Sequence, residues 1–159
     1  MYKNRIGVIY PLVHVLNRGI DALVNLAIEC VQLQCWDPKL YTKENALKAK
    51  QVLEAAGIQI SSFWAGWSGP RIWNLIDGPT TLGIVPAGYR HIRMEELVKA
   101  ADFAHHLGVK DMATHLGFIP ENPFTQEYRE VVQAVKYVAD HCKSKGIYFI
   151  KMGVKPLRL

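Results

Sequence analysis

The sequence contains few cysteines and no long hydrophobic run. Three cysteines, Cys30, Cys35 and Cys142, occur among 159 residues, and no two of them form a CxxC pair. An odd number without such a pair fits neither a disulfide framework nor a zinc knuckle, so we expect a reducing, cytoplasmic location. No segment approaches the ~18 consecutive apolar residues that a membrane span requires. We therefore expect no membrane partner.

A basic stripe and a dinucleotide-binding turn are also lacking. The formal net charge is +5, but most basic residues alternate with acidic ones, as at Lys43-Glu44. Nucleic-acid binding usually shows as a basic stripe with aromatic partners, so we expect no nucleic-acid partner. The turn after the first apolar run, residues 10–14, has no glycine, whereas a dinucleotide-binding fold needs GxGxxG there.

What the sequence does have is a repeated joint between helical and strand-like segments. Half of the residues are hydrophobic and 21% are charged, which is the composition of an ordinary globular domain. Glycine stands between a helical pattern and an apolar run at Gly57, Gly108 and Gly146. Glycine readily adopts the left-handed conformation that ends many helices, after which the chain can turn into a strand. The joint predicts successive β/α units.

Apolar periodicity predicts four helices and five strands. Apolar residues recur at spacings of 3 and 4 in four segments, and the expected helices cover about residues 17–28, 43–56, 94–107 and 125–142. Short apolar runs between them predict buried parallel strands, at residues 6–10, 31–35, 58–65, 109–115 and 147–150. Asn17 and Thr125 are the expected first residues of the first and fourth helices, with Asn17 as an N-cap.

Two architectures fit this βαβαβαβαβ order, an open doubly wound sheet and a piece of a (β/α)8 barrel. A full barrel takes ~250 residues, and five-eighths of that is about 156, close to the length of the chain. We therefore predict an α/β fold, an incomplete (β/α)8 TIM barrel of about five parallel strands and four helices. The Gly-, Pro- and Trp-rich insertion at about 66–93 is long for a compact domain and is expected to be a lid or binding loop.

Three segments carry a resemblance to a known family. They are the opening strand IGVI at 6–9, the strand VQL at 31–33 and the turn THLGFIPE at 114–121. In this order they resemble the xylose isomerase-like TIM barrels. That superfamily contains sugar phosphate isomerases, ketose 3-epimerases, inosose-type isomerases and dehydratases, and endonuclease IV. The resemblance covers about residues 5–149 and implies a sugar isomerase/epimerase-type protein with a small sugar or cyclitol as its substrate.

The resemblance also implies metal-assisted proton transfer. Family members hold a divalent metal (Mn²⁺, Mg²⁺ or Zn²⁺) with carboxylates and a histidine on strands five to eight, and glutamates on strands five and eight move the proton. In this sequence no acidic residue follows Asp140. The resemblance therefore assigns neither a catalytic residue nor a metal ligand here, and we expect this chain alone to hold no metal.

The sequence divides into two parts at the fifth predicted strand. Residues 1–149 follow the family pattern and form the expected partial barrel. Residues 150–159 are basic and fall outside that pattern. A truncation or a shifted reading frame is our hypothesis for their origin.

The candidate substrate-binding residues are those expected at the C-terminal ends of the strands, where TIM-barrel sites are built: Tyr10, Gln34, Trp36, Trp64 and His115. Aromatic faces at a barrel mouth can stack on the C–H surface of a sugar, and His115 can contact a hydroxyl. Trp67 and Trp73 also lie close to a predicted strand end. For each of these residues, ordinary packing or structural hydrogen bonding remains an alternative.

Two hypotheses from different classes stay open. Either the chain is a sugar isomerase/epimerase-type protein whose activity needs residues it lacks, or it is a catalytically inactive half-barrel that only folds and self-associates. An endonuclease IV-like repair function is less favoured, because the six histidines form no cluster. A sheet that does not close leaves two unpaired edges and an uncovered face, so we expect a homodimer or larger oligomer.

Overall fold

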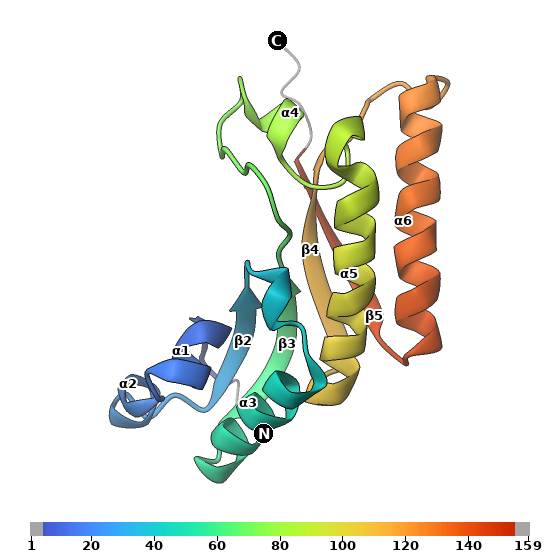
Figure 1. The fold of residues 1–159 in the computed structure, drawn as a ribbon. Helices are drawn as coiled ribbons and strands as arrows, with labels where there is room; N and C mark the ends of the chain where they lie inside the picture. The colour runs from blue at the N-terminus through green and yellow to red at the C-terminus, as the bar shows by residue number, and fades with distance from the viewer. Residues whose placement is uncertain (1–4, 155–159) are drawn as a thin grey trace.

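Five strands and the helices between them alternate along the chain in a computed structural model of the protein, which describes residues 5–154 and, for 151–154, the strand path alone (Figure 1). The strands are β1 (Gly7–Pro11), β2 (Cys30–Cys35), β3 (Gln59–Ala65), β4 (Asp111–Phe118) and β5 (Tyr148–Val154). The helices are α1 (Leu12–Asn17), α2 (Asp21–Asn25), α3 (Lys43–Ala55), α4 (Gly78–Thr81), α5 (Ala87–Leu107) and α6 (Gln126–Ser144), with a 3-10 turn at Pro38–Leu40.

The strands form one parallel sheet in the order β1-β2-β3-β4-β5. Successive side chains of a strand point to opposite faces. In β2, Val31, Leu33 and Cys35 are buried, whereas the alternating Gln32 and Gln34 are only partly buried. The predicted α/β fold of five parallel strands is thus confirmed, and the polar side chains of β2 lie on the face away from the helices.

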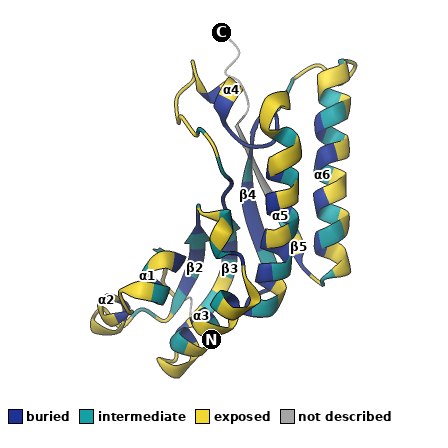
Figure 2. Ribbon diagram, viewed as in Figure 1, coloured by how far each residue is buried: buried dark blue, intermediate teal, exposed yellow. Residues whose placement is uncertain are grey.

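The hydrophobic core fills the space between the sheet and the neighbouring helices α1, α3, α5 and α6. Leu33 and Phe63 from the strands are fully buried there with Leu53 of α3 and Leu97 of α5. Figure 2 shows the buried residues along the strands and along the helix faces that meet them. Burying apolar area of this kind is the main stabilising contribution to the fold.

The first predicted helix is two helices, and its expected N-cap is wrong. Asn17 is the last residue of α1, which begins directly after β1. Leu12 and Val15, one helical turn apart, are both buried and fix this early start. Gly19 then adopts a left-handed φ of 81° and separates α1 from α2. By contrast, the Thr125 hydroxyl accepts a hydrogen bond from the Tyr128 amide at 3.2 Å and caps α6, as the sequence predicts.

The third predicted helix is longer than expected and the insertion is shorter. Helix α5 begins at Ala87, behind Pro86, rather than at residue 94. The insertion between β3 and α5 therefore covers residues 66–86 and contains the short helix α4. Helix α4 and the division of the first predicted helix into α1 and α2 explain why the described residues form six helices rather than four.

The fifth strand includes part of the predicted tail. Residues 150–154 belong to β5 and pair with β4, while residues 155–159 lie outside the described residues. The origin of the tail stays a hypothesis. In the described part of the chain, no helix is both long enough and apolar enough to cross a membrane.

Candidate functional site

Four tryptophans and one histidine meet at the C-terminal ends of β2, β3 and β4. The Trp36 ring lies 5.7 Å from Trp64, 5.2 Å from Trp67 and 6.0 Å from Trp73, measured between centroids. The His115 ring lies 4.7 Å from Trp73 and 5.8 Å from Trp64. These separations are in the range that aromatic pairs prefer. We call these five residues the aromatic site.

Strand register explains why residues distant in sequence share one face. Trp64 of β3 pairs with Gln34 of β2 on one side and with Ala113 of β4 on the other. His115 lies two residues beyond Ala113, so its side chain points to the same face. On this face the Gln32 amide donates a hydrogen bond to the Ser62 hydroxyl at 2.9 Å. The face is therefore partly polar, as expected for the inside of a barrel.

Four of the five residues predicted to bind substrate lie close together, whereas Tyr10 lies elsewhere. Trp36, Trp64 and His115 belong to the aromatic site, and Gln34 neighbours Trp64 through its register. Tyr10 pairs with the buried Leu33 and packs against the core on the helix side. Its hydroxyl donates to the Gly19 carbonyl at 3.3 Å.

A cavity of about 270 Å³ opens beside Trp36. Gln34 and Arg71 line it together with Pro11 and Asp37. The Arg71 guanidinium lies 5.3 Å from the centroid of the Trp36 ring, a cation–π arrangement. The cavity thus combines an aromatic wall with amide, guanidinium and carboxylate groups, which is the mixture expected of a site for a small polar molecule.

Three polar atoms of the aromatic site are buried without a hydrogen-bond partner in the described part of the chain. They are Trp64 Nε1, Trp67 Nε1 and His115 Nδ1. Buried polar atoms are nearly always paired, and an indole N–H can only donate. Each of the two indole N–H groups therefore lacks an acceptor among the residues that the structure describes.

Burial sets the protonation of His115. It lowers the pKa of this imidazole below its ordinary value of 6.5. A neutral imidazole has one N–H donor and one nitrogen acceptor. At neutral pH His115 can therefore donate to one hydroxyl group and accept from another.

Two contacts that periodicity does not reveal hold the ends of β2 and β3 together. The buried Tyr41 hydroxyl lies 2.9 Å from the Cys35 carbonyl and 3.0 Å from the Gly66 carbonyl. A side chain at Gly66 would meet the Cys35 carbonyl at 2.7 Å and the Trp36 backbone at 2.8 Å. Glycine is thus needed for the close approach that places Trp36 beside Trp67.

The histidine–glycine turn of β4 has a direct physical explanation. Gly117 adopts a φ of 96°, which side chains other than hydrogen rarely allow. The Leu82 carbonyl lies where a side chain at Gly117 would begin. The amides of Ile84 and Val85 donate to the Leu116 carbonyl at 3.0 and 3.2 Å. The glycine thus lets the insertion dock on β4 immediately beyond His115.

The described residues do not fit the divalent metal that the family resemblance implies. Among them, no group of three or more His, Cys, Asp or Glu side chains could hold a metal ion. Within the aromatic site, His115 is the sole side chain of these four types. We therefore derive no step through a metal.

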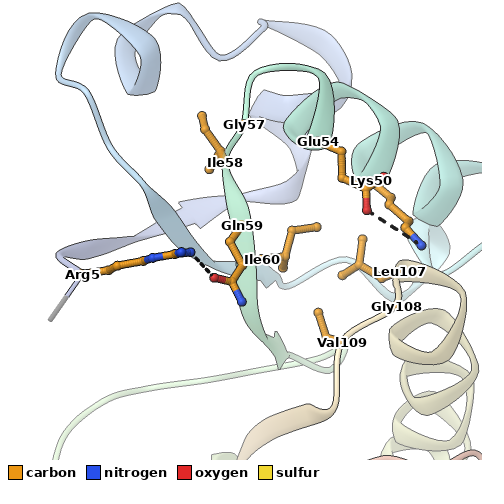
Figure 3. Close-up of a pocket in the computed structure, with 10 residues that line it drawn as sticks. All are labelled: Arg5, Lys50, Glu54, Gly57, Ile58, Gln59, Ile60, Leu107, Gly108 and Val109. Atoms are coloured by element: carbon orange, nitrogen blue, oxygen red, sulfur yellow. Dashed lines mark hydrogen bonds and ion pairs between the residues drawn. The ribbon is translucent and has the colours of Figure 1, made fainter. Parts of the chain in front are cut away.

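A second cavity, of about 400 Å³, lies at the opposite end of the sheet (Figure 3). Arg5 donates to the Gln59 side chain at 2.5 Å on one side of it, and Lys50 lies 3.9 Å from Glu54 on another. Gly108, at the end of α5, also lines it. The N-terminal end of the strands in a TIM barrel serves stability rather than chemistry, so we assign no reaction to this cavity.

Comparison with known proteins gives one family and a common fold. The xylose isomerase-like TIM barrel family model matches residues 20–151. A xylose isomerase domain protein from Planctomyces limnophilus is 27% identical, with a TM-score of 0.84 over 92% of this chain and 52% of that one. No curated protein sequence gives a significant match.

Two further solved structures share the fold at lower identity. A D-tagatose 3-epimerase-like protein is 14% identical, with a TM-score of 0.68 over 96% of this chain and 55% of that one. A D-psicose 3-epimerase studied in the presence of D-fructose is 12% identical, with a TM-score of 0.58 over 90% and 50% of the respective chains. The chain thus spans about half the length of the structures it matches.

Proposed function

Because the chain belongs to the xylose isomerase-like TIM barrel family, we propose that its aromatic site binds a small sugar or cyclitol as part of a sugar isomerase/epimerase-type site. The unpaired polar atoms of Trp64, Trp67 and His115 are the observation that carries this proposal. Two solved structures with this fold are described as a D-tagatose 3-epimerase-like protein and a D-psicose 3-epimerase, which supports a sugar as the ligand.

The chemistry of the aromatic site matches that of a sugar. A sugar ring has apolar C–H faces and hydroxyl groups around its rim. Indole rings cover the C–H face with a large apolar surface, while their N–H groups donate to hydroxyl oxygens. The neutral His115 donates to or accepts from a further hydroxyl. Together these groups orient the ring and exclude water from one of its faces.

Proton transfer is the part of the reaction that these side chains do not supply. Moving a proton to and from carbon requires a positioned acid or base, and His115 is the one such group in the aromatic site. In the family, by resemblance, glutamates on strands five and eight move the proton, and no acidic residue follows Asp140 in this sequence. We therefore propose that this chain alone binds the sugar without converting it.

The experiment measures binding and proton exchange separately. Calorimetric titration with D-fructose and with myo-inositol tests binding to the wild-type chain, to His115→Asn and to the control His91→Asn, whose residue is exposed on α5. Exchange of a sugar C–H with deuterated solvent, followed by NMR with Mn²⁺, Mg²⁺ or Zn²⁺, tests turnover. We expect binding that His115→Asn weakens and the control preserves, without exchange.

Other outcomes select the alternatives. Absence of sugar binding by the folded wild-type chain would favour the inactive half-barrel. Metal-dependent exchange by the chain alone would contradict the proposal that it lacks the proton-moving groups. Salt-dependent binding of duplex DNA in place of sugar would favour the repair function.

We propose in addition that the chain forms a homodimer or larger oligomer. The support is the first strand, which has one unpaired edge in the described part of the chain, carries the exposed Val8 and Ile9, and directly follows the exposed Ile6. Large exposed apolar patches usually mark an interface. Light scattering of the purified chain tests this, and a stable monomer at high concentration would contradict it.

A further inference from the structure

Arg93 is a charged residue with a fully buried side chain, which is uncommon and calls for an explanation. It lies on α5, within the range predicted as a loop. Its guanidinium donates to the carbonyls of Ser68 at 3.1 Å, Pro70 at 2.8 Å, Thr81 at 2.8 Å and Gly83 at 2.6 Å. These four carbonyls belong to two short stretches, one at each end of the insertion.

Neighbouring groups add to the contacts between Arg93 and the insertion, which together we call the anchor. The Glu96 carboxylate, one helical turn from Arg93, accepts a hydrogen bond from the Ser68 amide at 2.9 Å. The guanidinium carbon lies 4.6 Å from the Tyr89 ring and 5.4 Å from the Trp67 ring. Burial lowers the pKa of Arg93 to about 10, while Glu96 acts to raise it. Arg93 therefore remains charged at neutral pH, and its hydrogen bonds are of the stronger, charge-assisted kind.

Residues 71–80 lie between the two stretches that Arg93 holds, and Trp73 in this segment is part of the aromatic site. We call residues 71–80 the arm. Figure 1 shows this part of the chain, in green, projecting beyond the C-terminal ends of β2 and β3. Leu75 and Ile76 on the arm are exposed. Trp73 is also about half exposed (51%), but its ring contacts the rings of His115 and Trp36. Its position depends on where the two ends of the arm are held.

We propose that Arg93 is the positioning residue of the aromatic site. It ties both ends of the arm to α5 and so places Trp73 against His115. The fork of five N–H donors explains why arginine stands here, because a lysine ammonium is a compact point charge that cannot serve four carbonyls in one plane. The role in ligand binding rests on the proposed sugar site, whereas the placement of Trp73 can be tested without a ligand.

The test uses the fluorescence of Trp73. A protonated imidazole quenches an indole that it touches, so lowering the pH should quench the wild-type fluorescence as His115 titrates. The quenching that is lost in His115→Asn is the part caused by His115. Of that part, the quenching that is also lost in Trp73→Phe comes from Trp73 rather than Trp64, and we call it the Trp73 component. We expect Arg93→Lys to lose most of the Trp73 component, and the double variant Arg93→Lys/Trp73→Phe to lose no more than Trp73→Phe alone.

Controls separate positioning from general instability. Circular dichroism must show that each variant is folded, and Arg129→Lys, at an exposed arginine of α6, should keep the full quench. If Arg93→Lys does not fold, Ser68→Pro removes the amide that donates to Glu96 and tests the same anchor from the insertion side. A folded Arg93→Lys variant with unchanged quenching would overturn the proposal.

Sugar titration of the same variants separates this proposal from the proposed function. Weaker D-fructose binding by Arg93→Lys, together with a lost Trp73 component, supports both. The wild-type protein could instead bind no sugar while Arg93→Lys still loses the Trp73 component. Arg93 would then still position Trp73, but the sugar site, and with it the role of Arg93 in ligand binding, would be contradicted.

Discussion

Trp73 of the insertion packs edge-on against His115 of β4, with 4.7 Å between their ring centroids and an interplanar angle of 75°. Trp73 comes from the irregular insertion, and His115 lies near the C-terminal end of β4. The candidate site is therefore assembled where the insertion meets the strands. Its geometry depends both on strand register and on the contacts that hold the insertion.

The burial of His115 predicts a specific dependence of stability on pH. Because its pKa is lowered in the folded state, the unfolded chain binds a proton at a higher pH than the folded chain does. The free energy of unfolding should then fall as the pH drops through 6.5 and level off below the folded-state pKa.

Urea unfolding of the wild type and His115→Asn at several pH values between 7.5 and 5 measures this effect. The variant should show a weaker pH dependence, and the control His91→Asn should behave as the wild type does. An identical pH dependence in wild type and His115→Asn would show that His115 is not buried as described.

The turn after His115 predicts that Gly117 cannot be replaced. Gly117→Ala combines a left-handed backbone with a close approach of the Leu82 carbonyl, so we expect it to lower the free energy of unfolding by about 2 kcal/mol. At Gly88, in the first turn of α5, an added side chain meets no atom within 4 Å. There the same substitution should raise the free energy of unfolding by about 0.5 kcal/mol. Equal effects at both positions in urea unfolding would contradict this account.

A cluster between α5 and α6 predicts a second pH effect. Asp102 Oδ1 lies 2.9 Å from Lys145 Nζ and 3.0 Å from His141 Nε2. Burial acts to raise the pKa of Asp102, but hydrogen bonds from Lys145 and His141 outweigh it and hold that pKa below 3.8. A carboxylate with a lowered pKa contributes stability above its unfolded-state pKa, and this contribution is lost as the pH falls through the folded-state value.

Asp102→Asn should therefore lower the melting temperature at pH 7, and the gap to the wild type should close as the pH falls below about 4. Asp140→Asn, on the exposed side of α6, is the matched control and should have little effect. A gap that stays constant down to pH 2 would show that the loss of packing, rather than of charge, accounts for the difference.

Much of the fold could be predicted because it follows from local patterns. Gly57, Gly108 and Gly146 were expected to end helices, and all three adopt left-handed φ values, of 71°, 85° and 71°. Thr125 was expected to open the last helix and caps it. Such features depend on a few neighbouring residues, which is why periodicity and capping rules find them.

The remaining features depend on contacts between distant segments. Arg93 was placed in a loop because the Trp- and Gly-rich insertion masks the start of α5, and nothing in its local sequence shows that its partners are carbonyls of residues 68–83. Trp64 and His115 could be paired through the expected strand ends. The contact of His115 with Trp73 could not, since it requires knowledge of how the insertion folds back.

A crystal structure of the chain soaked with D-fructose tests the central claim most directly. We predict a sugar ring stacked on the tryptophans of the aromatic site, with its oxygens within hydrogen-bond distance of Trp64 Nε1 and His115 Nδ1. A sugar bound only at the opposite end of the sheet, or these two nitrogens paired with other groups of the protein, would contradict the assignment of the site.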